Sequence, residues 1–173
     1  MKRAKFVPNE RTWMLVIPST PRGKAFDRFV FRWTGFSPIS FQYAKARRRR
    51  YHRPHVLLTT IGSKTGALRT SCLPYFRYAD ALVVCGSKGG GPRDPFWANN
   101  LRKEPQCWIR VRGQLVPAFG RVAEGDEREN VFDVVADQHV GLRRYEELAG
   151  EHGRHVPLVL LTRGRPFPPE PDG

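Results

Sequence analysis

Two short glycine-containing loops are the segments of this chain whose residue types and spacing favour binding chemistry. The first, GSKTG, occupies residues 62–66 and is followed three positions later by Arg69. The second, SKGGG, occupies residues 87–91 and follows a run of strand-forming apolar residues. Glycine lets backbone N–H groups converge on an anion, and a neighbouring lysine or arginine supplies the countercharge. Together the two loops predict a site for a phosphate-bearing ligand.

A helix expected after the second loop strengthens this prediction. Asp94 precedes Pro95, and this pair favours a helix that begins with the proline and is capped by the aspartate side chain. The N-terminus of a helix carries a partial positive charge that stabilises a nearby anion. We therefore expect Asp94 to cap a short helix whose N-terminus lies beside the second loop.

The sequence does not indicate metal binding, acid–base catalysis or nucleophilic catalysis. It has no Cys-x-x-Cys, and His152 and His155 have no third ligand near them in sequence, so we expect no metal site. GSKTG lacks the leading glycine of a Walker A loop and lies between two expected strands, whereas a Walker A loop opens a helix. The Gly-x-Ser-x-Gly pattern of serine hydrolases does not occur.

Composition limits the class of protein further. The 173 residues suffice for a domain with a buried core, and no apolar run is long enough for a transmembrane helix. Cys72, Cys85 and Cys107 lie far apart in strand-like runs, so we expect buried thiols in a cytoplasmic protein. Lys and Arg outnumber Asp and Glu by 30 to 16, and the net charge of +14 favours an anionic partner or ligand.

The order of the expected elements predicts the fold class. Thr20 and Gly35 are suitable caps for an N-terminal helix. Six strand-like runs with turn residues between them follow at residues 56–61, 68–78, 81–86, 106–111, 114–123 and 156–161. Strands and helices do not alternate regularly, which favours an antiparallel barrel over a parallel sheet. We therefore expect a mainly β, α+β fold: an antiparallel barrel of about six strands with peripheral helices and an N-terminal helix.

This pattern predicts three regions. Residues 1–52 form an N-terminal amphipathic helix and a basic linker, and residues 53–163 form the barrel domain. Residues 164–173 are rich in proline and are expected to be a disordered tail.

Residues 56–111 resemble the deazaflavin-dependent nitroreductase family, whose members use the 8-hydroxy-5-deazaflavin coenzyme F-420. The similar pieces, in the family's order, are VLLTTIGSKTG, the pair Arg69-Thr70, VVCGSKGG, PFWANNL and EPQCWIRV. Residues 120–129 and the closing VPLVLL also fit. The family has a split β-barrel fold, which agrees with the number of strands expected from the sequence pattern.

The resemblance implies a binding site for the deazaflavin coenzyme. By analogy, the phosphate and its neighbouring groups would be held by residues of the two loops and the strand between them: Lys64, Thr65, Arg69, Ser87, Lys88 and Gly89. Trp97 and Asn100 would line the site from the helix, and Cys72 would lie against the ring. Members often have Arg-Lys where this chain has Ser63 and Lys64, and they commonly have proline at position 72.

The implied activity is hydride transfer from the reduced coenzyme to a small hydrophobic acceptor: a quinone, a nitroaromatic or a conjugated enone. Such a coenzyme carries the chemistry itself, which agrees with the lack of candidate acid and base residues in the sequence. Tyr145 is a candidate for positioning the acceptor; the alternative is an ordinary exposed helix residue.

Two other functions fit part of the sequence. A nucleic-acid-binding module would use the +14 charge and the four consecutive arginines at 47–50, although the aromatic residues lie in core-like runs away from that basic stretch. A split barrel that binds ordinary flavin mononucleotide (FMN) is the other alternative.

The N-terminal region has two interpretations. Its helix places Phe26, Phe29, Val30 and Trp33 on one face, with basic residues around the remainder. Such a helix can lie on an anionic membrane, which would make the cytoplasmic protein peripheral to the inner face of the cell membrane. Alternatively, the apolar face covers one mouth of the barrel.

Overall fold

The computed structural model describes residue 17 and residues 20–46, 54–139 and 141–164. The chain divides into two compact units, Met1–Arg53 and Pro54–Gly173, and each is described by itself. The arginines at 47–50 and nearly all of the predicted tail, residues 165–173, lie outside the described residues.

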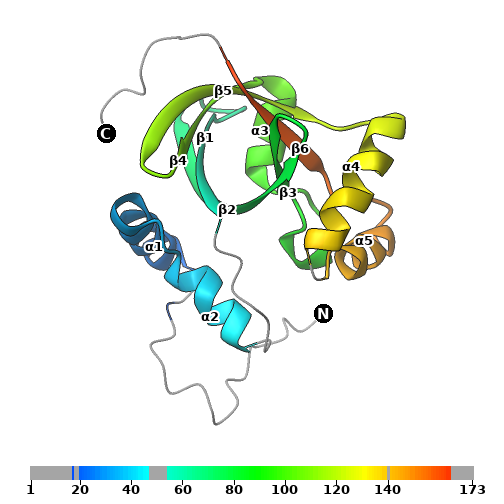
Figure 1. The fold of residues 1–173 in the computed structure, drawn as a ribbon, viewed down its shortest axis with the longest axis horizontal. Coiled ribbons are helices and arrows are strands. Elements are labelled where there is room, and N and C mark those ends of the chain that lie inside the picture. Colours follow the sequence, from blue (N-terminus) through cyan, green and yellow to red (C-terminus); the bar gives the residue numbers. More distant parts are fainter. Residues whose placement is uncertain (1–16, 18–19, 47–53, 140, 165–173) are drawn as a thin grey trace. The chain divides into compact units, whose positions relative to one another are not determined.

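The larger unit contains a closed antiparallel barrel (Figure 1). Its strands, in the order in which they neighbour one another, are β1 (His55–Ile61), β2 (Leu68–Tyr78), β3 (Ala81–Cys85), β6 (Leu158–Arg163), β5 (Gln114–Val122) and β4 (Gln106–Val111). β4 pairs back onto β1, with Thr59 opposite Trp108, and this pairing closes the barrel. The predicted antiparallel six-stranded barrel is thus confirmed.

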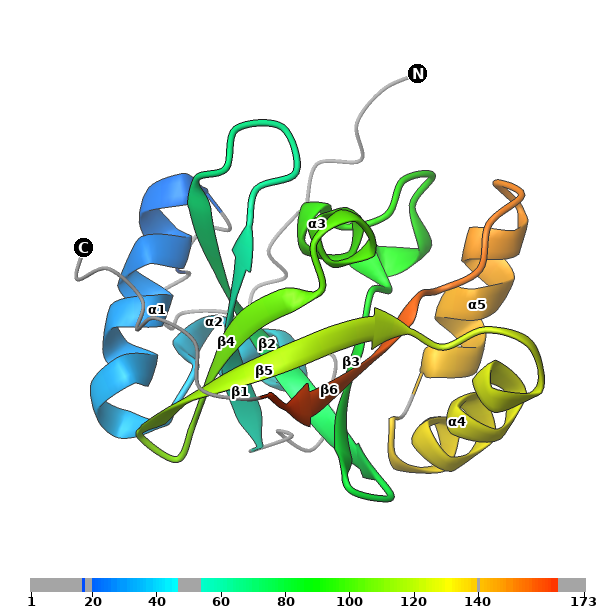
Figure 2. The same ribbon diagram turned by 90° about the horizontal axis from the view of Figure 1, so that it is seen from above.

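In the described part of the larger unit, three α-helices and a short 3-10 helix accompany this barrel. They are the 3-10 helix Lys88–Gly90, α3 (Phe96–Lys103), α4 (Gly125–Gln138) and α5 (Leu142–Gly150). Both views show α4 and α5 together on the flank formed by β3 and β6, whereas α3 lies elsewhere on the barrel (Figure 2).

Alternating side chains of the strands build two separate cores. On β3, Val84 belongs to the barrel core, whereas Val83 belongs to a second core outside it. β6 alternates in the same way, because Val159 packs in the first core and Leu158 in the second. α3 contributes to the barrel core, and α4 and α5 cover the second core. Successive side chains of a strand point to opposite faces of the sheet. One face therefore packs in the barrel core with α3, and the other packs in the second core with α4 and α5.

α3 approaches β5 closely at a glycine. A Cβ atom on Gly120 would lie 2.8 Å from Cδ1 of Leu101, a buried residue of α3. Real Cβ atoms do not come so near to another side chain. The absence of a side chain at Gly120 therefore allows α3 to pack closely on β5.

The described residues of the smaller unit form two helices, α1 (Pro21–Thr34) and α2 (Pro38–Ala46). Thr20 Oγ1 accepts a hydrogen bond from Gly23 N–H at 3.2 Å, and Gly35 ends α1 with φ +66°. Both predicted caps are confirmed. The buried carboxylate of Asp27 joins the helices, because it accepts hydrogen bonds from Ser37 Oγ and Ile39 N–H at 2.9 Å each.

The predicted aromatic face of α1 is not the face that it buries. Phe26, Phe29 and Trp33 are 51%, 64% and 75% exposed. The buried residues of α1 are instead Gly23, Asp27 and Phe31. In the described part of the chain, no helix has both the length and the apolar character needed to cross a bilayer.

Candidate functional site

The loop between β1 and β2 is a closed turn that carries basic residues outward. Gly62 N–H donates to Ala67 O at 2.9 Å, and Gly66 N–H donates back to Gly62 O at 2.8 Å. Lys64 and Thr65 are exposed in this turn, and Arg69 is exposed on β2 beside it. The turn therefore presents two cations to solvent on a backbone that its own hydrogen bonds define.

Asn100 anchors this turn to α3. Its buried side chain donates through Nδ2 to Thr60 Oγ1 at 2.9 Å and accepts through Oδ1 from Ser63 N–H at 3.0 Å. Lys103 Nζ adds a bond to Ser63 O at 2.7 Å. Both ends of the Asn100 amide are thus engaged in positioning the turn, and Ser63 N–H is committed to the amide oxygen.

The second loop forms an anion-binding curve of the backbone, often called a nest. Ser87 has φ −60° and ψ −42°, and it is followed by Lys88 and Gly89 with φ of +43° and +71°. This change from right-handed to left-handed backbone turns successive N–H groups toward one side. The N–H groups of residues 87–89 find no acceptor among the described residues.

The glycines of this loop serve different purposes. A Cβ on Gly86 would lie 2.5 Å from Pro157 Cγ, and one on Gly90 would lie 2.4 Å from Leu148 Cβ. Gly89 would meet nothing within 4 Å. Gly86 and Gly90 therefore permit close packing on the rest of the protein, whereas Gly89 allows a left-handed backbone that faces open space.

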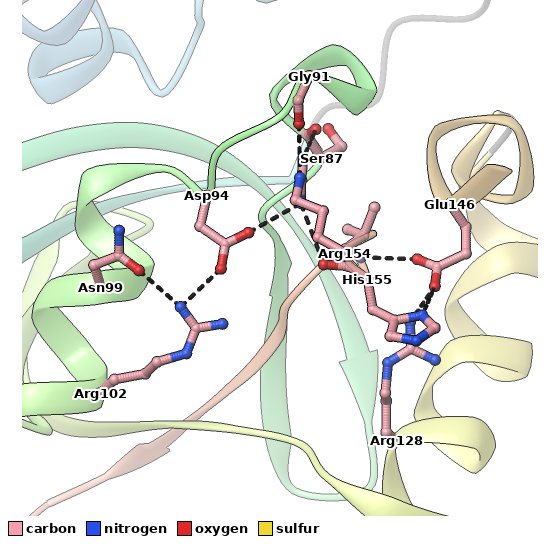
Figure 3. A network of polar contacts seen from close by, with 10 residues as sticks. Ser87, Gly91, Asp94, Asn99, Arg102, Arg128, Glu146, Arg154 and His155 are labelled. Atoms are coloured by element: carbon pink, nitrogen blue, oxygen red, sulfur yellow. Dashed lines mark hydrogen bonds and ion pairs between the residues drawn. The ribbon is translucent and has the colours of Figure 1, made fainter. Parts of the chain in front are cut away.

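The predicted capping role of Asp94 is wrong. α3 begins at Phe96 after Pro95, with no side-chain cap. The carboxylate of Asp94 instead binds Arg154 at 3.0 Å through Oδ1 and Arg102 at 2.7 Å through Oδ2, as Figure 3 shows. Two guanidinium groups outcompete the helix N–H groups, because charge-assisted bonds are the stronger ones.

Arg154 comes from the connection between α5 and β6 and contacts the glycine loop directly. Its Nε donates to Gly91 O at 2.7 Å, and Nη2 donates to Ser87 O at 3.0 Å. With the Asp94 ion pair, this guanidinium joins both ends of the loop to the segment before α3 (Figure 3).

Glu146 of α5 holds the connection that carries Arg154. Its carboxylate accepts from Val156 N–H at 2.8 Å, His155 Nδ1 at 2.5 Å and Arg128 Nη2 at 2.6 Å (Figure 3). Burial alone would raise the pKa of Glu146, but these hydrogen bonds and the charge of Arg128 outweigh burial and lower it. Sequence reasoning missed both Arg154 and Glu146, because their partners are distant in sequence and neither residue lies in a motif.

The remaining predicted site residues lie in different surroundings. Cys72 is half-buried on β2, opposite Leu57 of β1. Trp97 is 7% exposed and belongs to the barrel core. Tyr145 is half-buried on α5 and makes an edge-on contact with His139, their ring centres 6.1 Å apart. α3 thus joins the two loops, whereas Tyr145 packs against the second core.

The cysteines of β3 and β4 are not poised for nucleophilic chemistry. Burial raises the pKa of both Cys85 and Cys107 to about 12. Both thiols are therefore protonated at neutral pH, whereas a nucleophilic cysteine must be a thiolate. The groups available to a ligand at the two loops are backbone N–H groups and exposed cations, which bind and orient.

Residues 42–163 match the family of F420H(2)-dependent quinone reductases. The chain belongs to this family. An F420H(2)-dependent quinone reductase of Mycobacterium tuberculosis is 32% identical over 112 residues, which are 64% of this chain and 74% of that protein. Membership confirms that the protein is an F420-dependent oxidoreductase, as the resemblance implied.

Solved structures agree with the fold. An F420-H2 dependent reductase is 27% identical, with a TM-score of 0.55, over 63% of this chain and 94% of its own. A structure described as a domain-swapped dimer is 24% identical, with a TM-score of 0.56, over 72% of this chain and 99% of its own, and it supports the fold alone.

The glycine loop generates a stability prediction. Gly90→Ala places a Cβ against Leu148 in a left-handed backbone, so we expect it to lower the free energy of unfolding by about 2–3 kcal/mol. Gly89→Ala adopts a similar backbone in open space and should lose only about 1 kcal/mol. Urea unfolding of both variants measures the difference. Equal losses of unfolding free energy in the two variants would show that crowding by Leu148 is not why position 90 requires glycine.

Glu146 generates a pH prediction. Because its folded-state pKa lies below the usual value of 4.5, its ionised form stabilises the protein above that value, and the contribution is lost as pH falls through the lowered pKa. Glu146→Gln should therefore be less stable by about 1–2 kcal/mol at neutral pH, and the difference should shrink in acid.

Urea unfolding across this pH range measures the effect. Glu147→Gln is the matched control, since Glu147 neighbours Glu146 on α5 but forms an exposed ion pair with Arg144. A difference for Glu146→Gln that persists unchanged in strong acid would contradict the assignment.

Proposed function

We propose that the backbone nest at residues 87–89 receives the anionic phosphate group of coenzyme F-420. The observation that carries this proposal is the set of three consecutive N–H groups that find no acceptor among the described residues. Lys88 is exposed in the same loop, and Lys64, Thr65 and Arg69 are exposed on the hairpin that α3 ties to the barrel. Convergent N–H groups with cations beside them suit a phosphate.

The coenzyme, when bound in reduced form, supplies a hydride to a small hydrophobic acceptor, and a quinone is the class that the family favours. The protein's own residues bind and orient the reactants, and the raised pKa of Cys85 and Cys107 keeps both thiols protonated. We propose that half-buried Cys72 lies on the ring side of the site. Asn100 and Trp97 shape the site indirectly, through the turn and the barrel core. Tyr145 packs against the second core, and this position gives no support to its proposed contact with the acceptor.

Coenzyme binding is tested by titration with the oxidised coenzyme, read by deazaflavin fluorescence. Lys64→Ala and Lys88→Ala should each weaken binding by about 1.5–3 kcal/mol, the range for a hydrogen bond to a charged group. Arg144→Ala, on the exposed face of α5, is the control and should bind like the wild type. Unchanged affinity in both lysine variants would overturn the site, and binding of FMN or DNA in place of F-420 would favour the alternatives.

Hydride transfer is tested with reduced coenzyme that carries deuterium at the deazaflavin C5. A conjugated enone is a suitable acceptor, because the hydride forms a C–H bond that does not exchange with water. We expect the deuterium in the enone product and substantial turnover in Cys72→Ser and His155→Gln. Loss of turnover in either variant without loss of coenzyme binding would show that a side chain takes part in the chemistry.

We propose further that α1 contacts anionic membrane surfaces, where hydrophobic quinones are found. The support is the exposure of Phe26, Phe29 and Trp33 on a helix that also carries Arg22 and Arg32. Aromatic and basic residues together favour the interface of an anionic bilayer.

Sedimentation with vesicles tests this contact. Full-length protein should pellet with anionic vesicles at low salt and stay in solution with neutral ones, since each basic residue near such a surface contributes roughly 1 kcal/mol. A Phe29→Ser/Trp33→Ser variant should lose most of the binding. Wild-type protein that stays in the supernatant with anionic vesicles would contradict the proposal.

A further inference from the structure

Arg154 has more hydrogen-bond partners than an ordinary surface arginine. Its side chain is 12% exposed. It donates to two carbonyl oxygens of the glycine loop, those of Ser87 and Gly91, and Nη1 binds both Asp94 and the carbonyl of His155. These bonds use four of the five N–H donors that a guanidinium group has. Little donor capacity is left for a ligand, so the role of Arg154 is to hold the protein itself.

Two carbonyl groups that accept from Arg154 lie at the two ends of the glycine loop, residues 87–91. Ser87 O and Gly91 O bracket the residues with left-handed backbone, Lys88, Gly89 and Gly90. In a trans peptide the carbonyl and the following N–H point in opposite directions. Holding Ser87 O toward Arg154 therefore directs the N–H of Lys88 away from Arg154, and that N–H is one of the three without an acceptor in the described chain.

The positive charge of Arg154 is balanced by the carboxylate of Asp94. Asp94 lies 3.0 Å away, and the same carboxylate also pairs with Arg102 of α3 at 2.7 Å. On the other side, Glu146 fixes the residues after Arg154 by accepting from Val156 N–H. Figure 3 shows the contacts of Glu146 on one side and those of Asp94 on the other, joined by the chain that carries Arg154.

We propose that Arg154 is a positioning residue for coenzyme binding: it fixes the peptide planes of the glycine loop so that the N–H groups of residues 87–89 converge on the anion. This inference rests on the proposed function of that loop. In this proposal, the connection between α5 and β6 influences the affinity for the coenzyme through its contacts with the carbonyl groups of the glycine loop.

Arg154→Lys is the decisive variant, because lysine keeps the charge but lacks the planar fork. That fork reaches three carbonyls, two of them in the glycine loop, and the carboxylate of Asp94. We expect the Kd for F-420 to rise about tenfold or more, as for loss of a charge-assisted hydrogen bond. Arg144→Lys, on an exposed part of α5, is the matched control and should leave the Kd unchanged. The acceptor KM at saturating coenzyme should stay the same, since the acceptor does not bind through the nest.

The rate of amide hydrogen exchange reports on the hydrogen bonds of the loop in the absence of ligand. Gly90 N–H donates to Ser87 O, so its exchange should be faster in Arg154→Lys than in the wild type, while amides of the β-strands keep their rates. Saturating coenzyme should slow Gly90 exchange more in Arg154→Lys than in the wild type, because ligand and arginine favour the same loop geometry. If Arg154→Lys does not fold, Asp94→Asn tests the same contacts, with a smaller rise in Kd expected.

The outcomes separate this inference from the function on which it rests. The positioning role would be overturned, with the coenzyme site left intact, if Arg154→Lys kept both the wild-type affinity and the wild-type exchange rate of Gly90. If Asp94→Asn is used in its place, wild-type affinity in that variant has the same meaning. A wild-type protein that does not bind F-420 would overturn the proposed function and the inference together. The titration of the wild type alone distinguishes these two failures.

Discussion

The backbone of residues 87–89 has an uncommon conformation that the contacts around it hold in place. This backbone keeps three consecutive N–H groups without an acceptor in the described chain. Lys88 has φ +43°, a left-handed conformation that strains residues other than glycine. Such a loop needs support from its surroundings. Gly86 packs on Pro157 and Gly90 on Leu148, and Arg154 holds the carbonyls at both ends. The surrounding protein thus keeps the donors in a fixed arrangement before any ligand arrives, which reduces the ordering that binding would require.

α3 connects the glycine loop to the first loop, the turn after β1. Arg102 links α3 to Asp94 beside the glycine loop, and Asn100 links it to the turn after β1. Gly120 allows α3 to pack closely on β5, so both connections rest on the barrel. The two loops are separated in sequence by two strands, yet one helix positions both.

Local signals made part of this arrangement predictable from the sequence. Thr20 and Gly35 act within one turn of α1, and alternation along β3 and β6 defines two faces of the barrel, so caps and strands could be anticipated. The glycine loop was recognisable because glycine tolerates a left-handed backbone. The role of Asp94 was mistaken because its partner Arg154 lies 60 residues away, and Asn100 meets Ser63 across 37 residues. A local capping rule cannot anticipate a distant guanidinium group that competes for the same carboxylate.

Amide NMR detects directly whether the backbone of residues 87–89 receives the coenzyme's anion. Titration of the isotope-labelled wild-type protein with F-420 should move the amide proton resonances of Ser87, Lys88 and Gly89 downfield, as their N–H groups gain an anionic acceptor. These should be the largest changes, and the amide of Ser63, which already donates to Asn100, should move little. Saturable binding that leaves those three resonances in place, with the large changes elsewhere, would contradict the account.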